Sequence, residues 1–195
     1  MLKKIATLAT AALTGGFALN HQVHAAPIDA ADGKTAYDFT LTAIDGAPMP
    51  LSQFKGKVIL LVNTASKCGL TPQYEGLEKL QDTYAAKGFT VLGVPSGDFM
   101  GQEFGSNKEV AEFCETRFGI SFPLAEKAHV KGKNATPLFK WAFTTLGKGS
   151  EPGWNFHKYL IGRDGRLLGY FNSRVTPESP EVTSAIERAL AAPAS

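Results

Sequence analysis

The stretch that decides the fold is VILLVNTASKCGLTPQYEGLEKLQDTYAAKGFTVLGV, residues 58–94. It begins with the apolar run 58–62 and ends with a second run at 89–94, and short runs rich in branched residues are typical of fully buried strands. Between them, apolar residues recur every three or four positions over 72–87, which gives one apolar helix face. Thr-Pro before this segment and Gly after it are helix start and stop signals. The stretch therefore predicts a βαβ unit with two parallel strands.

Beyond this unit the sequence predicts three more helices and one β-hairpin. A Ser-x-x-Glu capping box starts the first of these helices, and Asp-Gly between two apolar runs is the strongest short hairpin signal. The predicted elements are a helix over 107–117, a helix from Thr136-Pro137 onward, strands over 156–161 and 166–171, and a helix over 180–192. This order predicts an α/β fold, a thioredoxin-like sandwich whose central mixed sheet is flanked by helices, with an inserted middle helix.

The first 25 residues have the pattern of a secretory signal peptide. Lys3 and Lys4 precede an uncharged, mostly apolar stretch over 5–19, and short side chains stand at the cleavage-determining positions before and at Ala25. A membrane anchor is the alternative, but the stretch is shorter than the roughly 20 residues that span a bilayer. We therefore expect cleavage after Ala25 and an exported protein, periplasmic or secreted.

The rest of the chain has the composition of one globular domain. Of 195 residues, 44% are hydrophobic and 19% are charged, which excludes a wholly disordered chain. Residues 26–36 are small and polar and predict a flexible lead-in, and residues 37–192 form a single predicted domain.

Charge and residue counts exclude several function classes. Two of the 20 basic residues lie in the leader, which holds no acid, so the remaining bases balance the 18 acids. A neutral body offers no electrostatic footprint for nucleic acid or an anionic membrane, and we expect neither partner and no membrane insertion. With only two cysteines and four histidines, we expect no metal site and no cofactor.

Cys68 stands between the first predicted strand and the helix that follows it. A thiol has an unperturbed pKa of about 8.5, and one held beside amide donors at a helix N-terminus can be mostly ionised. A buried, inert cysteine is the alternative, but the strand-to-helix position favours a reactive one. Thr71 stands where a CxxC motif has its second cysteine, and Ala65 where peroxiredoxins usually have a threonine. Both of those patterns are therefore absent.

Three blocks of the chain carry a specific resemblance to a known family. They are NTASKCGLTPQYEGLEKL (residues 63–80), PSGDFMGQEFG (residues 95–105) and Trp-Asn-Phe (residues 154–156). Together they resemble the glutathione peroxidase family around its peroxidatic residue, and the resemblance extends from Tyr37 to the final helix.

The resemblance implies a catalytic tetrad of Cys68, Gln102, Trp154 and Asn155. The two carboxamides and the indole are neutral N–H donors, which suit the stabilisation of a thiolate and of a developing oxyanion. It also implies a thiol peroxidase that reduces hydrogen peroxide and organic hydroperoxides. The short segment 146–153 before the Trp-Asn pair is similar to that of the usually monomeric branch of the family.

Cys114 lies on the same face of the predicted helix 107–117 as Val110 and Phe113. Helical spacing alone indicates a core residue, and two cysteines in an exported protein are also compatible with a permanent disulfide, which would remove the nucleophile. The resemblance implies a third role, a resolving cysteine that forms a Cys68–Cys114 disulfide intermediate. A thioredoxin-like protein or glutathione would then reduce this disulfide.

Two alternative functions stay open from the sequence. One is a peroxide sensor or thiol oxidant that passes its disulfide to a partner protein, and the other is a catalytically silent binding module. Three polar residues near the motifs are expected to stay outside the chemistry. Asp98 would oppose ionisation of a nearby thiol, so we expect it to point to solvent. We expect Lys67 to be a solvated surface lysine and His157 to lie on a strand surface.

Overall fold

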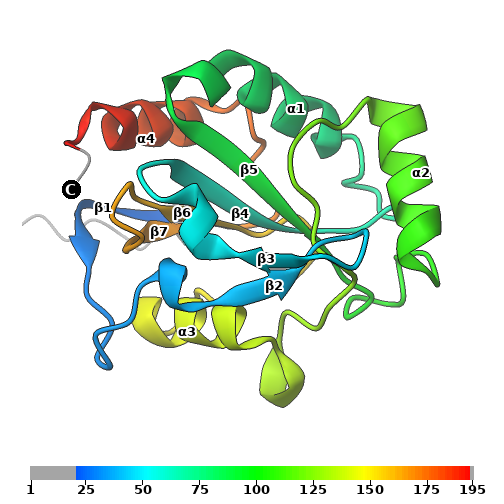
Figure 1. Cartoon of the computed structure of the whole chain (residues 1–195), viewed down its shortest axis with the longest axis horizontal. Coiled ribbons are helices and arrows are strands. Elements are labelled where there is room, and N and C mark those ends of the chain that lie inside the picture. The colour runs from blue at the N-terminus through cyan, green and yellow to red at the C-terminus, as the bar shows by residue number, and fades with distance from the viewer. Residues whose placement is uncertain (1–20, 194–195) are drawn as a thin grey trace, which may run out of the picture.

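The computed structural model describes residues 21–193, which contain a five-stranded sheet of order β1-β7-β6-β4-β5 (Figure 1). The predicted βαβ unit is confirmed, because β4 (Val58–Thr64) and β5 (Phe89–Pro95) pair in parallel and α1 (Gln73–Tyr84) connects them. Every residue of both strands is buried, since structure covers both faces of the sheet. A short 3-10 turn follows α1 and ends at Gly88, which has φ 88°.

The predicted hairpin is β6 (Lys158–Ile161) and β7 (Leu167–Phe171), and β6 also pairs antiparallel with β4. Gly165 in the turn has φ 81°, and a Cβ there would lie 2.8 Å from the ring of Tyr37, so the turn needs glycine on both grounds. Strand β6 begins at Lys158 rather than at the predicted residue 156, because Phe156 has φ 65°, which is not a strand conformation.

The three remaining predicted helices are also confirmed. They are α2 (Asn107–Phe118), α3 (Pro137–Leu146) and α4 (Pro180–Ala191). In front of α2, the Ser106 side chain accepts from the Glu109 amide and the Glu109 carboxylate accepts from the Ser106 amide, so the capping box is complete.

Helices cover the two faces of the sheet unequally (Figure 1). Helices α1 and α4 pack on one face and α3 on the other, while α2 stands at one end of the sheet. Side chains of β4 alternate between these layers: Ile59 and Leu61 join the core under α3, and Leu60 and Val62 join the core under α1 and α4. The predicted α/β sandwich with a mixed, helix-flanked sheet is therefore the observed architecture.

The N-terminal strand was not predicted. Strand β1 (His21–Ile28) pairs antiparallel with β7, so residues 26–28 belong to the sheet and the expectation of a flexible lead-in over 26–36 is wrong for them. The close approach of β1 to β7 depends on Gly169 in β7, where a Cβ would collide with the Gln22 carbonyl oxygen. Of the predicted signal peptide, residues 1–20 lie outside the described residues.

A small antiparallel pair and several short turns complete the chain. The pair is β2 (Thr40–Thr42) and β3 (Pro48–Pro50), and the 3-10 turns are Ala36–Asp38, Leu51–Phe54, Ala85–Lys87 and Gly132–Asn134.

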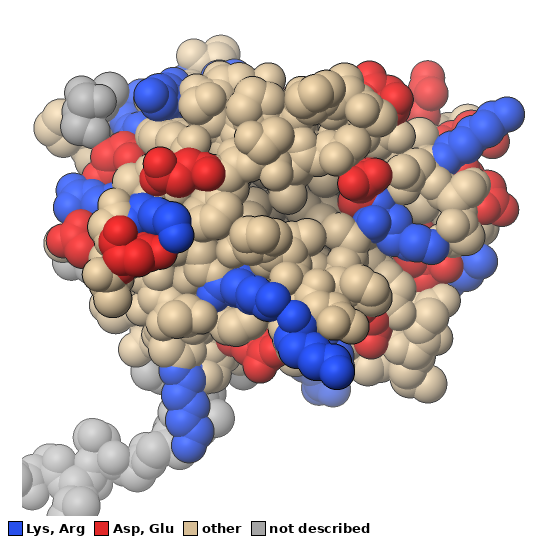
Figure 2. Space-filling model, turned by 60° about the horizontal axis from the view of Figure 1, so that its bottom comes forward, with Lys and Arg blue, Asp and Glu red and all other residues tan. Residues whose placement is uncertain are grey.

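Charged side chains of both signs are interspersed on the face shown in Figure 2, around a wide uncharged area. Among the described residues, opposite charges pair at several places, including Lys34 with Asp32 and Lys79 with Glu178. Within residues 21–193, no helix has the length and apolar character needed to cross a membrane.

Candidate active site

The turn between β4 and α1 places Cys68 and its hydrogen-bond donors. The Cys68 amide donates to Thr71 Oγ1 at 3.0 Å, and the Thr71 hydroxyl donates to the Ala65 carbonyl at 2.9 Å. This closed turn directs the Leu70 amide at the Cys68 sulfur, 3.3 Å away. An N–H group in this position can donate a hydrogen bond to negative charge on the sulfur. Thr71 occupies the position of the missing second cysteine and was not expected to contribute.

Gln102 reaches this turn from the loop between β5 and α2. Its carbonyl accepts from the Lys67 amide at 2.9 Å, and the neighbouring Glu103 carboxylate accepts from the Ser66 amide at 3.2 Å. These two bonds hold the loop along the Cys68 turn. The Gln102 side chain is fixed in addition by Asn155, whose Nδ2 donates to Gln102 Oε1 at 2.9 Å.

Asn63, the polar residue near the end of β4, holds the third segment of the site. Its Nδ2 donates to the Trp154 carbonyl at 3.1 Å, its Oδ1 accepts from the His157 amide at 3.0 Å, and its carbonyl accepts from the Phe156 amide at 2.6 Å. The Trp154 ring packs on Phe99 with 5.6 Å between centroids. Sequence reasoning missed Asn63, and the signal that could have found it is a fully buried polar side chain closing an apolar run.

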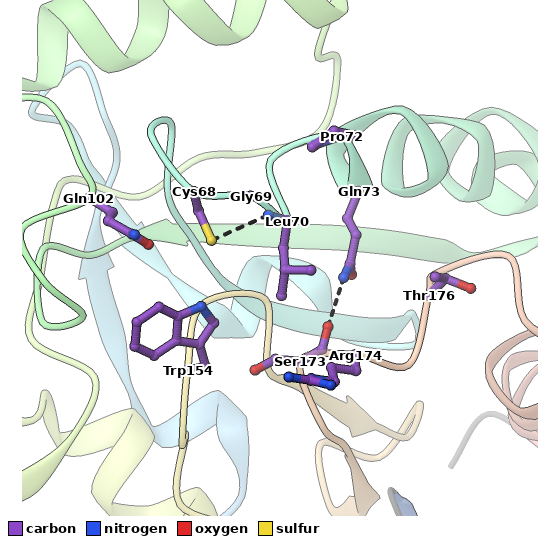
Figure 3. Close-up of a pocket in the computed structure, with 10 residues that line it drawn as sticks. All are labelled: Cys68, Gly69, Leu70, Pro72, Gln73, Gln102, Trp154, Ser173, Arg174 and Thr176. Atoms are coloured by element: carbon purple, nitrogen blue, oxygen red, sulfur yellow. Dashed lines mark hydrogen bonds between the residues drawn. The ribbon is translucent and has the colours of Figure 1, made fainter.

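The structure brings all four predicted tetrad residues together. Cys68, Gln102 and Trp154 line one pocket of about 800 Å³, and Asn155 is buried behind Gln102. In Figure 3 the indole nitrogen of Trp154 and the end of the Gln102 side chain point toward the Cys68 sulfur. The sulfur itself is largely buried, with 8% of the residue exposed. The remaining lining residues are Gly69, Leu70, Pro72, Gln73, Ser173, Arg174 and Thr176.

Asp98 does not point to solvent, and that expectation is wrong. Its side chain is only 10% exposed and contacts His129 Nδ1 at 2.5 Å, while the Val130 and Lys131 amides donate to its other oxygen at 2.8 and 3.3 Å. Burial raises the pKa of the Asp98 carboxyl, but the bonds from His129 and Val130 outweigh this and leave the pKa below its usual value. The carboxylate therefore fastens the loop before Gln102 to the segment before α3.

Cys114 is buried in α2, with 1% of the residue exposed, and both cysteines are free thiols. Burial raises the pKa of the Cys114 thiol to about 11, against a smaller lowering by Tyr74, and the charge of Glu103 adds a still smaller rise. Cys114 is therefore a neutral thiol in this state, and no permanent disulfide is present.

His157 is not on a strand surface, so that expectation is also wrong. It is 1% exposed and lies between the rings of Tyr159 and Tyr170, at centroid distances of 4.8 and 5.5 Å. Burial, and then the Lys158 charge, lower the pKa of His157 to about 3. Lys158 is itself fully buried, with its ammonium 2.8 Å from Gln73 Oε1, and burial lowers its pKa to about 7.

Lys67 is exposed, as expected, and its ammonium lies 4.2 Å from the centroid of the Phe104 ring. Within the part of the chain that the structure describes, no group of three or more His, Cys, Asp or Glu could hold a metal ion.

Comparisons with known proteins extend these observations. A family model described as glutathione peroxidase matches residues 36–143. The hydroperoxy fatty acid reductase gpx1 of Synechocystis sp. is 45% identical over 165 residues, covering 80% of this chain and 96% of the relative. The thioredoxin/glutathione peroxidase BtuE of Escherichia coli is 40% identical over 170 residues, covering 76% and 93%. The crystal structure of Trgpx in apo form has a TM-score of 0.68 and 36% identity, and covers 83% of this chain and 99% of that one.

Proposed function

The chain belongs to the glutathione peroxidase family, and on this premise we propose that it reduces hydrogen peroxide and organic hydroperoxides at Cys68. The observation that carries this proposal is the set of groups around one sulfur: the Leu70 amide donates to it at 3.3 Å, and the side chains of Gln102 and Trp154 line the same pocket. All three are neutral N–H donors, so the site can stabilise a thiolate without a titrating partner.

In the first step the Cys68 thiolate attacks one oxygen of the peroxide. The O–O bond breaks, the sulfur becomes a sulfenic acid, and the leaving oxygen takes up a proton to become water or an alcohol. The N–H groups that held the negative sulfur then face the negative charge that develops on the leaving oxygen. Gln102 and Trp154 therefore act in both halves of the step.

Cys114 then attacks the sulfenic acid, forming a Cys68–Cys114 disulfide and releasing water. This step needs α2 to open locally, because Cys114 is buried against α1 in the reduced state. The weak anchoring of α2 supports such opening: only Val110 and Cys114 are buried among its residues.

The pocket beside Cys68 supports organic hydroperoxides as substrates. Leu70, Pro72 and Trp154 give it apolar walls, and Arg174 is an exposed cation on its rim. Among the residues that the structure describes, none of those lining it is acidic. An apolar hydroperoxide that carries a carboxylate fits this combination, in keeping with the name of the hydroperoxy fatty acid reductase from Synechocystis.

A thioredoxin-like protein is the proposed reductant, with glutathione as the alternative. The name of the E. coli relative, a thioredoxin/glutathione peroxidase, includes both donors. A resolving cysteine favours a dithiol donor, because the intermediate to be reduced is then an intramolecular disulfide.

We also propose that the protein is exported after cleavage behind Ala25, because residues 1–25 have a basic, then apolar, then small-residue pattern. The short segment 146–153 before the Trp-Asn pair supports the proposal that it is a monomer. Cleavage there would divide β1 and leave only Ile28, opposite Leu167, of its described register pairs. N-terminal sequencing of the protein secreted with its own leader tests the cleavage, and light scattering tests the monomer.

Steady-state peroxide consumption tests the function as a whole. Wild type and the Cys68→Ser and Cys114→Ser variants are assayed with a thioredoxin system and with glutathione. We expect no activity without Cys68, and a loss of thioredoxin-dependent activity without Cys114. Intact mass after one equivalent of peroxide should show the loss of two hydrogen atoms in wild type, and a persistent sulfenic acid in wild type would contradict the resolving role.

A further inference from the structure

Lys158 carries its amino group into the closed layer between the sheet and α1. The residue is 0% exposed, and its strand partners Val62 and Phe171 both belong to the core under α1 and α4. Among the described residues, no carboxylate forms an ion pair with it. A buried cation without a counter-ion is costly, so a lysine in this place calls for an explanation.

Gln73, the first residue of α1, is the side chain that Lys158 contacts. Lys158 Nζ donates to Gln73 Oε1 at 2.8 Å and to the Phe156 carbonyl at 2.7 Å. Gln73 Nε2 donates in turn to the Ser173 carbonyl at 2.7 Å, a bond drawn dashed in Figure 3. Gln73 is 8% exposed and lines the Cys68 pocket. The buried lysine is therefore one hydrogen bond away from a side chain in the pocket wall.

The two partners fix which end of the Gln73 carboxamide lies where. The Lys158 nitrogen offers hydrogens, so Oε1 must face it, and the Ser173 carbonyl can only accept, so Nε2 must face it. An amide nitrogen carries two hydrogens, and the Ser173 carbonyl uses one. The second is the donor that Gln73 can offer to a molecule in the pocket. The arrangement resembles the pair formed by Asn155 and Gln102, in which a buried donor also occupies Oε1 of a glutamine that lines the pocket.

The pocket has two ends with different chemistry. In Figure 3 Gln102 lies on one side of the Cys68 sulfur, and Gln73 and Arg174 lie on the other. Arg174 is an exposed cation, and the ammonium form of Lys158 adds a second positive charge behind Gln73. No acid is among the described residues that line the pocket. An N–H donor backed by a cation, with no acid beside it, favours an anionic group.

We propose that Gln73, oriented by Lys158, binds the carboxylate of an organic hydroperoxide whose peroxide group lies at Cys68. The inference rests on the proposed function, in which organic hydroperoxides react at this sulfur, and it adds the donor that recognises their acid group. Gln73 is the binding residue, and Lys158 is a positioning residue that acts through it. An ester of the same hydroperoxide carries no charge and loses the stronger, charge-assisted form of this bond. The acid should therefore react faster than its ester.

The test measures oxidation of Cys68 in single turnovers, without a reductant, by linoleic acid hydroperoxide and by its methyl ester. Reduced full-length protein is mixed with each hydroperoxide below its critical micelle concentration, and mass analysis of quenched samples gives the rate. The quantity compared is the ratio of the acid rate to the ester rate within one protein, which cancels any change in the reactivity of Cys68 itself.

Two variants separate the roles of the two residues. Lys158→Met removes the donor that orients Gln73. Gln73→Glu keeps an oxygen for Lys158 but replaces the N–H donor by a negative charge. Gln53→Glu, the same change at an exposed position outside the pocket, is the matched control.

We expect wild type to react at least about fivefold faster with the acid than with the ester. The ratio should fall toward one in Lys158→Met and below one in Gln73→Glu, where the new carboxylate repels that of the substrate. Gln53→Glu should keep the wild-type ratio.

A wild-type ratio of one, or a wild-type ratio retained in Gln73→Glu, would overturn the carboxylate site. A wild-type ratio retained in folded Lys158→Met would overturn the positioning role. Gln73→Glu keeps the contact with Lys158, so it decides the question even if Lys158→Met does not fold. If neither hydroperoxide oxidises Cys68 in wild type, the proposed function fails instead.

Discussion

Asn155 donates from Nδ2 to Oε1 of Gln102 across 2.9 Å, although the two residues lie 53 positions apart in the chain. The bond decides which end of the Gln102 carboxamide is available. With Oε1 accepting from Asn155, Nε2 is the atom of the carboxamide that stays available to donate, in a side chain that lines the Cys68 pocket. Asn155 does not line the pocket itself, so its contribution is to orient the donor that does.

Replacing Asn155 by Asp reverses this relationship. An ionised carboxylate cannot donate, so Gln102 must turn its Nε2 toward residue 155 and its oxygen toward the thiolate. We expect the rate of Cys68 oxidation by hydrogen peroxide to fall by at least about tenfold, equivalent to about 1.4 kcal/mol. Stopped-flow tryptophan fluorescence, to which Trp141 also contributes in both proteins, measures this rate. Asn134→Asp, at an exposed position, is the control, and an Asn155→Asp rate within twofold of wild type would contradict the orienting role.

Thr71 offers a test of the Cys68 turn with a conservative pair of variants. Thr71→Val keeps the shape of the side chain but leaves the Cys68 amide and the Ala65 carbonyl without their partner. We expect the free energy of unfolding to fall by about 2 kcal/mol, and the alkylation rate of Cys68 at neutral pH to fall, because the Leu70 amide loses its fixed direction. Thr71→Ser keeps the hydroxyl, so it should retain most of the free energy of unfolding and most of the Cys68 alkylation rate. Equal behaviour of the two variants would exclude a role for the hydroxyl.

The helices and the parallel strand pair could be predicted because their signals are local. The Ser106–Glu109 capping box and the Gly119 stop bound α2 within a residue of the predicted range. Strand β1 carried no such signal, since it exists only where Gly169 lets another strand approach. Long-range packing of this kind is invisible to propensity.

In the candidate site, too, some residues could be predicted from the sequence and others could not. Motif resemblance identified Cys68, Gln102, Trp154 and Asn155, and the fold brings them together. It identified neither Asn63 nor Thr71, whose roles consist of bonds to backbone groups. The two wrong expectations, for Asp98 and for His157, both concern burial by segments distant in sequence. Solvent exposure of a polar residue depends on which loop crosses it, and a single sequence does not state that.

Asp98 is expected to stabilise the loop before Gln102 rather than to perturb Cys68. Asp98→Asn loses the charge-assisted bonds to His129 and to the Val130 and Lys131 amides, which we expect to lower the free energy of unfolding at pH 7 by about 2 kcal/mol. Because the pKa of Asp98 in the fold lies below its usual 3.8, its contribution is present above pH 4 and is lost as the pH falls through the folded-state value. Denaturant titrations should therefore show that the free energy of unfolding of Asp98→Asn lies well below that of wild type at pH 7. At pH 3 the two values should lie close together. A difference that stays constant with pH would exclude the charge as its origin.

His157 predicts how the stability of the whole protein depends on pH. Its pKa in the fold is about 3, against 6.5 in an unfolded chain, because burial disfavours the imidazolium. Between these values the unfolded chain binds more protons, so stability must decrease as the pH falls from about 6.5 toward 3. Lys158, with a pKa lowered by burial from 10.5 to about 7, titrates above this window and cannot mask it. His157→Gln removes the titrating ring while remaining neutral, so its free energy of unfolding should decline less steeply than that of wild type between pH 6.5 and 4, whatever its value at pH 8. Urea titrations at half-unit intervals measure both slopes, and parallel slopes would show that the His157 ring is protonated in the fold as readily as in the unfolded chain.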